Sequence, residues 1–315
     1  MLHRLSNTIG FLIFFILVGT SLLVYTGHYF RETIASLEVT HSFSLVELDL
    51  KLPYWINYIV GLIILGANFW IVKSISSKHR FVEEAKVPFV MYYLIFISFF
   101  PALVLELELI LSSSICLLML YIILTIYNQT SVMLLVFVSS ILLGLASALY
   151  YPFAVLVIVL LMAISFFRSF EIREYIIAAI GILLPFFYLY SIAYLGDSKI
   201  AIPDFYILLF SYEFLSFSLG GALLFLLSFI SFVYVFITRS KLVVRQRNQL
   251  LIVMTFILVA FLMTFFLPKQ GAIVLLAAPL SLCFQIFYQN FNKKWILDLY
   301  LLLLLTTSIV EKING

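Results

Sequence analysis

The chain has 315 residues, of which 65% are hydrophobic and 10% are charged, with a mean hydropathy of +1.21 and a net charge of +3. Soluble domains carry about 25% charged residues, so this composition excludes a soluble globular protein and indicates helices that cross a lipid bilayer. The small positive charge comes without tracts that mix basic and aromatic residues, so no nucleic acid is expected as a partner.

Eleven apolar segments follow one another along the chain, and we predict a membrane-spanning helix for each. In order they are Thr8–Tyr29, Tyr54–Val72, Val87–Leu105, Leu109–Ile126, Ser131–Leu149, Phe153–Phe167, Tyr175–Leu195, Ser216–Ile237, Leu250–Leu267, Gly271–Gln289 and Trp295–Val310.

The weakest divisions between segments are at Glu106 and at Pro152. The stretch from Ser131 to Phe167 has 37 residues and no charge. As a single helix it would be about 55 Å long, whereas the hydrocarbon core of a bilayer is about 30 Å thick. We therefore predict a tight reversal of the chain at Pro152.

The basic residues indicate the orientation of these segments. With the N-terminus in the cytoplasm, thirteen Lys and Arg residues fall on the inner side and five on the outer side, as the positive-inside rule expects. The inner ones are Arg4, Lys73, Lys78, Arg80, Lys86, Arg168, Arg173, Arg239, Lys241, Arg245, Arg247, Lys293 and Lys294. We predict an all-α, eleven-pass membrane domain over residues 1–315, with its N-terminus in the cytoplasm and its C-terminus outside.

The two cysteines, Cys116 and Cys283, both lie inside predicted helices. We expect buried thiols that serve packing, and no disulfide framework.

Three stretches in the middle of the chain carry a family resemblance: Gly144–Pro152, Arg168–Tyr175 and Gly181–Phe186. Together they resemble a family of polytopic inner-membrane proteins of Gram-negative bacteria that is known only as a domain of unknown function. The match covers about Val87–Leu195. The resemblance implies the length, the topology and an inner-membrane location, but no established activity.

Some members of that family carry the label of a beta-carotene monooxygenase, and the residues here contradict it. That soluble enzyme family holds iron with four histidines. In the predicted topology His3 and His79 face the cytoplasm, whereas His28 and His41 lie outside. Because these four side chains cannot meet at one metal, we reject this activity.

Two pairs of acidic residues stand out on the predicted outer side: Glu47 with Asp49, and Glu106 with Glu108. In both pairs the acids alternate with apolar residues, and residues i and i+2 share a face in an extended segment. Converging carboxylates supply a general base or bind a hard divalent cation. The alternative is that each pair lies in a solvated turn between lipid-facing leucines.

This arrangement is similar to the C-type membrane glycosyltransferases, which take a sugar from a polyprenyl-phosphate donor. Their acids lie in the first outer loop and in the outer loop between helices three and four, where Glu47, Asp49, Glu106 and Glu108 are found. The similarity implies that Glu47 or Asp49 is the base, and that Glu106 and Glu108 support it or hold a metal. Lys269, in a sparse outer turn, would then face the donor phosphate.

The chain departs from that superfamily in two ways. Adjacent acids are expected soon after the first helix, where this chain has Arg31 and Glu32, and the sequence offers no extramembrane C-terminal domain. Lys269 also fits an interfacial lysine that snorkels to water. The alternative functions are a non-enzymatic membrane scaffold or assembly factor and, third, a transporter.

The predicted cytoplasmic loop Arg168–Glu174 is the candidate contact for a protein partner. On a helix Arg168 would pair with Glu171 at i and i+3. The alternative is a charged anchor that only fixes the topology.

Overall fold

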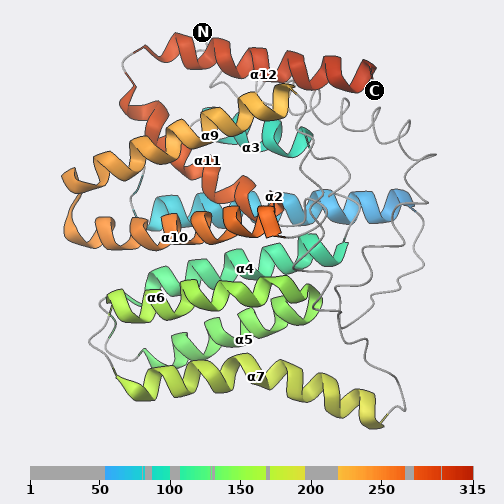
Figure 1. Ribbon diagram of the computed structural model, residues 1–315, viewed down its shortest axis with the longest axis vertical. Helices are drawn as coiled ribbons and strands as arrows, with labels where there is room; N and C mark the ends of the chain where they lie inside the picture. The colour runs from blue at the N-terminus through green and yellow to red at the C-terminus, as the bar shows by residue number, and fades with distance from the viewer. Residues whose placement is uncertain are drawn as a thin grey trace.

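The computed structural model describes residues 54–79, 81, 87–99, 107–127, 129, 132–167, 171–195, 219–266, 273–291 and 293–314. Every regular element within these ranges is a helix (Figure 1), so the all-α prediction is confirmed for them. The elements are α2 (Tyr54–Lys78), α3 (Val87–Ser98), α4 (Leu107–Thr125), α5 (Met133–Leu149), η3 (Tyr151–Leu156), α6 (Val157–Phe167), α7 (Ile172–Leu195), α9 (Leu219–Thr238), η4 (Arg239–Lys241), α10 (Val244–Phe266), α11 (Ile273–Asn290) and α12 (Lys294–Asn314).

Six of the described helices are long and apolar enough to cross a membrane, so the chain is a multi-pass membrane protein. These spans are Ile59–Lys78, Leu107–Thr125, Ile172–Leu195, Gly220–Thr238, Val244–Thr264 and Ile273–Asn290, and shorter apolar helices cover Met133–Leu149 and Tyr151–Phe167. Ten of the eleven predicted segments contain a described helix. The first, Thr8–Tyr29, lies outside the described residues.

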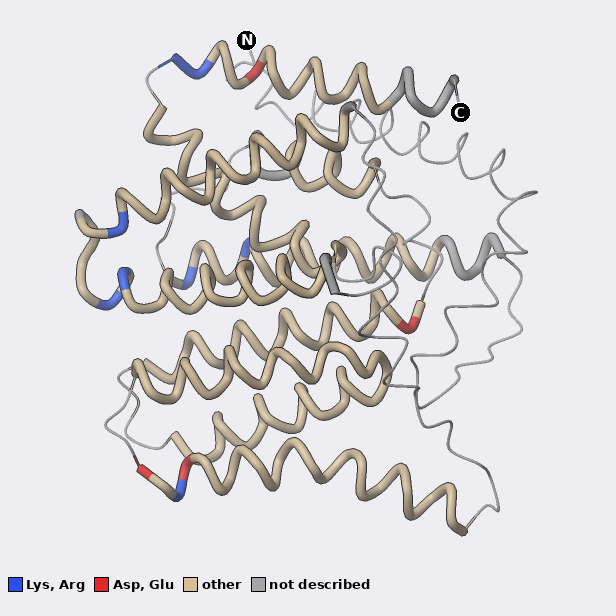
Figure 2. The backbone as a smooth tube through the Cα atoms, viewed as in Figure 1, with Lys and Arg blue, Asp and Glu red and all other residues tan. Residues whose placement is uncertain are grey.

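Side-chain contacts show which helix ends lie together. The end of α2 meets the end of α4, because Lys78 Nζ donates a hydrogen bond to Tyr121 Oη at 3.1 Å. The start of α10 joins them, since Gln249 Nε2 donates to the Leu124 carbonyl oxygen at 2.9 Å. In Figure 2 the residues coloured as Lys and Arg lie toward this end, where α2, α4 and α9 end and α7, α10 and α12 begin. We refer to it as the basic end.

The predicted reversal at Pro152 is confirmed. α5 ends at Leu149, and Tyr150 takes an extended conformation with φ −141° and ψ 96°. Pro152 then lies in the first turn of η3, where its missing N–H breaks no helical hydrogen bond. The chain returns through α6 to the basic end, where the rings of Phe167 and Tyr127 pack with centroids 5.6 Å apart.

Two predicted boundaries were wrong by six residues each. α2 continues beyond Val72 to Lys78, and α10 begins at Val244 instead of Leu250. Both extensions carry basic residues that the sequence analysis had assigned to loops. Long basic side chains at a helix end reach the interface while the backbone stays helical, so their charge does not mark the helix boundary.

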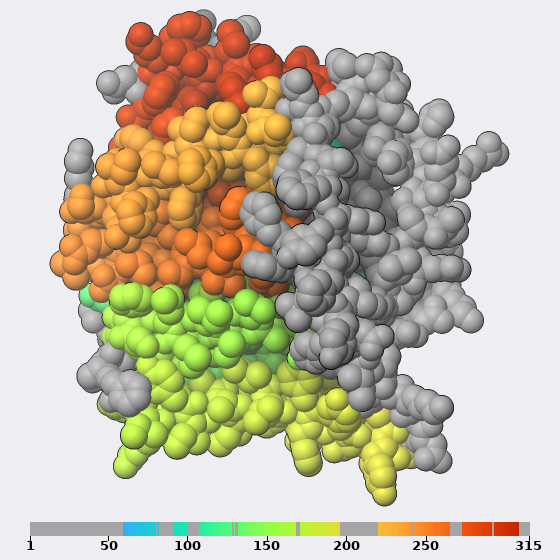
Figure 3. All heavy atoms as spheres, in the orientation of Figure 1, coloured from blue at the N-terminus to red at the C-terminus, as the bar shows by residue number. Residues whose placement is uncertain are grey.

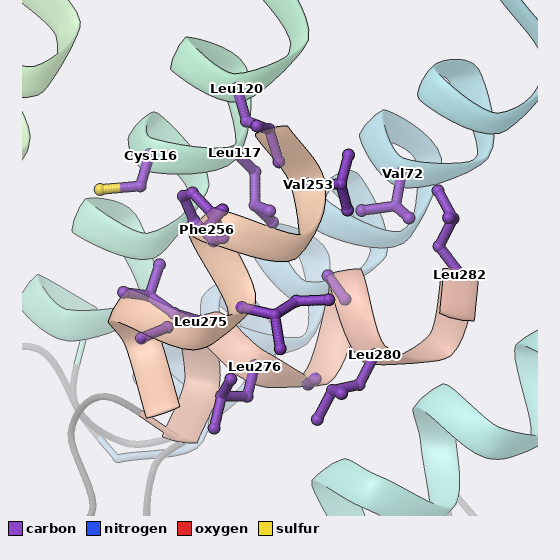
Figure 4. Close-up of a cluster of buried hydrophobic side chains, with 14 of the residues drawn as sticks. Val72, Cys116, Leu117, Leu120, Val253, Phe256, Leu275, Leu276, Leu280 and Leu282 are labelled. Carbon is purple, nitrogen blue, oxygen red and sulfur yellow. The ribbon is translucent and has the colours of Figure 1, made fainter. Parts of the chain in front are cut away.

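α11 forms the centre of the bundle. Every residue from Ile273 to Tyr288 is buried, and the helix contacts α2, α3, α4, α9 and α10. No face of α11 is therefore left for lipid, and the neighbouring helices bury it on all sides. Figure 4 shows part of this core: Val72 of α2, Leu117 and Leu120 of α4, Val253 and Phe256 of α10, and Leu275, Leu276, Leu280 and Leu282 of α11.

Helices α6, α7, α9 and α10 form much of the face of the molecule seen in Figure 3. The outermost of them, α7, has few buried residues and exposes large apolar side chains such as Ile180, Leu183 and Phe187. In a membrane protein such a face is the expected lipid contact.

α5 and α7 approach each other closely through glycines. A Cβ atom added at Gly144 would lie 2.5 Å from the Ile182 carbonyl oxygen, and one at Gly181 would lie 2.6 Å from Ser140 Cβ. Small residues allow such close backbone contact between membrane helices. The two glycines belong to two of the stretches that carry the family resemblance, and the structure brings those stretches into contact.

Candidate functional site

Most of the predicted carboxylate site lies outside the described residues. This applies to Glu47, Asp49, Glu106 and Lys269. Glu108 is described: it lies half-buried in the first turn of α4, at the opposite end of that helix from Tyr121. Because α4 begins at Leu107, Glu108 is helical and does not belong to the extended segment considered for the pair. The convergence of these residues on one site stays a prediction.

Two other predictions concern metal and thiol chemistry. In the part of the chain that the structure describes, no three His, Cys, Asp or Glu side chains lie close enough together to hold a metal ion. A site for the candidate divalent cation would therefore need residues beyond that part. Cys116 and Cys283 are both buried and free, as predicted.

The predicted partner loop Arg168–Glu174 is partly helical. Arg168 lies outside the described residues, whereas Glu171 and Arg173 are exposed. α7 begins at Ile172, so Glu174 sits in its first turn and is only 2% exposed. The predicted loop is therefore shorter than expected, because α7 already begins at Ile172 and packing covers Glu174. A protein partner at this loop stays a prediction.

The described residues do form one buried polar group that the sequence analysis did not predict. It lies at the basic end, where α2 and α4 end and α10 begins. His79 is 4% exposed and Gln249 is fully buried. We define the His79 cluster as these two residues with the side chains around them: Lys78, His79, Tyr121, Tyr127, Arg245 and Gln249.

Hydrogen bonds fix the orientation of both buried side chains. Gln249 Nε2 lies 2.9 Å from His79 Nδ1 and 2.9 Å from the Leu124 carbonyl oxygen. The amide nitrogen has two hydrogens and so can satisfy both acceptors. His79 Nδ1 then accepts, which puts the imidazole hydrogen on Nε2.

In this arrangement one hydrogen-bond donor and one acceptor remain unsatisfied. His79 Nε2 and Gln249 Oε1 are buried and have no hydrogen-bond partner among the described residues. An unsatisfied buried polar group costs about 1–3 kcal/mol. Native proteins generally supply a partner for such a group. Asn68 Oδ1 inside the bundle is unsatisfied in the same way, so what distinguishes the His79 cluster is the pair of cations beside it.

Two cations flank His79. Lys78 Nζ bonds to Tyr121 Oη and lies 4.5 Å from the centre of that ring, and the Arg245 guanidinium lies 6.0 Å from the centre of the Tyr127 ring. The pKa of His79 falls from 6.5 to about 4, first because the ring is buried and then because Lys78 and Arg245 repel a positive charge. The imidazole is therefore neutral at neutral pH.

The sequence contains only partial signals for this cluster. In it His79 is one of four histidines that cannot share a metal, and Lys78 and Arg245 are topology charges. A histidine directly after a spanning helix and a glutamine near the start of another were the available signals. Their contact spans 170 positions, and neither residue alone indicates it.

A second set of polar contacts ties helices together inside the bundle. Asn68 of α2 bonds to Ser113 of α4 at 3.5 Å, and Tyr93 of α3 donates to the Leu65 carbonyl oxygen at 3.0 Å. Tyr92 of α3 pairs with Ser228 of α9. Neutral hydrogen bonds of this kind hold membrane helices in register, so we assign these residues a structural role.

No family model, no curated protein and no solved structure matched the chain in comparisons with known proteins.

Proposed function

We propose that the chain is an eleven-pass protein of the bacterial inner membrane, with its N-terminus in the cytoplasm. Its activity would be the transfer of a sugar from a polyprenyl-phosphate donor to an acceptor at the outer face. This is the function of the C-type membrane glycosyltransferases. Their acidic residues lie in the same outer loops as the acidic residues of this chain.

The distribution of basic residues along the bundle supports the proposed orientation. The residues coloured as Lys and Arg in Figure 2 lie toward the basic end, as the positive-inside rule expects of a cytoplasmic side. Glu108 begins α4 at the opposite end. The positive end of the helix dipole favours a carboxylate in this first turn.

The proposed roles follow from the chemistry of the residues. Glu47 or Asp49 takes the proton from the acceptor, and Glu106 and Glu108 support that base or hold a divalent cation. Lys269 neutralises the donor phosphate. The family of unknown function remains the proposed relative.

We expect cysteines at positions 199 and 269 to react with an impermeant thiol reagent added outside intact cells, and a cysteine at 245 to react only after permeabilisation. The reason is that Lys199 and Lys269 fall on the predicted outer side and Arg245 at the basic end. The measurement uses a background in which Cys116 and Cys283 are replaced by serine. Labelling of position 245 from outside would contradict the orientation.

The enzymatic proposal is tested by sugar transfer from a labelled polyprenyl-phosphate donor in proteoliposomes. Asp49→Asn and Glu106→Gln keep the side-chain size but remove the base or metal ligand, so we expect each to lower the rate about 10²–10⁴-fold. Lys269→Ala should mainly weaken donor binding.

The matched control for these variants is Glu171→Gln, an exposed acid at the basic end, which should leave transfer unchanged. Folded wild-type protein that transfers no sugar from any donor tested would favour a scaffold. Normal transfer in both carboxylate variants would refute the assigned roles.

A further inference from the structure

We propose that the His79 cluster is a binding site for the phosphate of an anionic phospholipid in the cytoplasmic leaflet, with Lys78 and Arg245 as the groups that hold it. This site lies at the opposite end of the bundle from the proposed reaction; it rests on the proposed orientation but not on that reaction.

The depth of the two cations favours a lipid ligand. Lys78 is the last residue of the span Ile59–Lys78, and Arg245 follows the first residue of the span Val244–Thr264. Both side chains are exposed. A basic side chain at the end of a spanning helix lies at the level of the lipid headgroups, where anionic lipids attract it.

Each cation contacts an aromatic ring at or just after the end of α4. Lys78 rests on Tyr121 through a hydrogen bond and a ring contact, and Arg245 faces the ring of Tyr127. Neither cation forms an ion pair with any described residue. Cations that are positioned but not neutralised within this part of the chain are the groups that a phosphate would pair with.

The buried residues next to Lys78 and Arg245 distinguish this site from a general positive surface charge. Arg245 lies four residues before Gln249 on the same face of α10, and Gln249 contacts His79, which directly follows Lys78. The two cations therefore lie at the same helix junction. Gln249 bonds to His79 and to α4 at once and so fixes the junction of the three helices. A diffuse topology signal would need no such organised polar group.

Arg247 provides a matched control for Arg245. It is exposed, lies on the same helix two residues further on, and has no ring or ion-pair contact among the described residues. If the basic residues act only as a diffuse positive charge, Arg245→Gln and Arg247→Gln should have equal effects. A site predicts that Arg245→Gln has the larger effect.

The experiment measures binding of phosphatidylglycerol and of phosphatidylcholine to the full-length protein in detergent by native mass spectrometry. A basic residue near an anionic headgroup contributes about a fivefold change in affinity. We expect Lys78→Gln and Arg245→Gln each to weaken phosphatidylglycerol binding about fivefold, with wild-type binding kept by Arg247→Gln and largely kept by Lys78→Arg. Phosphatidylcholine should bind more weakly and respond to neither change.

A second measurement needs no variant in the site. In protein with ¹³C-labelled histidine, bound phosphatidylglycerol should raise the pKa of His79 from about 4, because the phosphate offsets the repulsion from Lys78 and Arg245. His79→Asn assigns the signal. Inorganic phosphate at the same concentration should leave the signal unchanged.

Three results would overturn the proposal. Equal losses of lipid binding in Arg245→Gln and Arg247→Gln would reduce the cluster to diffuse charge. An equal response to inorganic phosphate would make the ligand a soluble anion. Equally strong binding of phosphatidylcholine and phosphatidylglycerol to the wild-type protein would show that the site does not recognise an anionic headgroup.

Discussion

Gly144→Ala and Gly181→Ala are each expected to lower the free energy of unfolding by about 1–3 kcal/mol or more. The added methyl carbon would lie 2.5 Å from the Ile182 carbonyl oxygen in the first variant and 2.6 Å from Ser140 Cβ in the second. Neither neighbour is the end of a flexible side chain, so α5 and α7 must move apart. Because α7 has few other buried residues, moving it away from α5 removes much of the packing that attaches α7 to the bundle.

The control for the two glycine variants is Gly66→Ala on α2, where an added Cβ atom meets nothing within 4 Å. That change should be neutral or stabilise the protein by up to about 1 kcal/mol, because alanine favours the helix. The apparent Tm of the detergent-solubilised protein, followed by size-exclusion chromatography after heating, separates the cases. Equal Tm values for all three variants would contradict the close packing of α5 on α7.

Lowering the pH from 7.5 to 4.5 is expected to destabilise the wild-type protein more than the His79→Asn variant. In the folded protein the pKa of His79 is about 4, against 6.5 for an unperturbed histidine. Between these two values the unfolded chain binds a proton that the folded chain does not. Folding therefore becomes less favourable as the pH falls through this window, and the loss levels off below about pH 4.

Asparagine is the appropriate replacement because its side-chain oxygen can accept the hydrogen bond from Gln249 and never ionises in this range. The measurement is the Tm of both proteins across the pH window. Carboxylates that titrate there contribute equally to both, so the difference between the two curves reports His79. Parallel curves would show that the imidazole is protonated as readily as in the unfolded chain.

The architecture could be predicted from the sequence where only one arrangement of the chain is physically possible. A charge-free run from Ser131 to Phe167 is too long for one spanning helix, and a proline offers the place to divide it. The structure reverses there. Charge was less informative at the helix ends, because Lys78 and Arg245 lie within helices. The predicted end of α2 at Val72 therefore came too early, and the predicted start of α10 at Leu250 came too late.

The candidate sites were harder to predict. Glu47, Asp49, Glu106 and Glu108 were selected because acids are rare, which is a property of composition and says nothing of convergence. His79 and Gln249 are unremarkable in the sequence, and their significance arises only when α2 and α10 pack together. Gly144 and Gly181 were noticed as parts of a pattern, but their contact depends on the crossing of two helices that a single sequence does not specify.

The position of α11 has a consequence for how this protein is made. The helices that enclose it come from both halves of the chain, since α2, α3 and α4 precede it by more than 140 residues whereas α9 and α10 come directly before it. While the ribosome is still synthesising α11, the early helices must already stand in the bilayer with an unfilled space between them. A chain that stops after α10 would keep that space open and uncover Tyr92, whose ring stacks on Phe284 of α11. Such an intermediate is what a membrane chaperone or protease would recognise, so truncation before α11 should lead to degradation and not to a smaller stable protein.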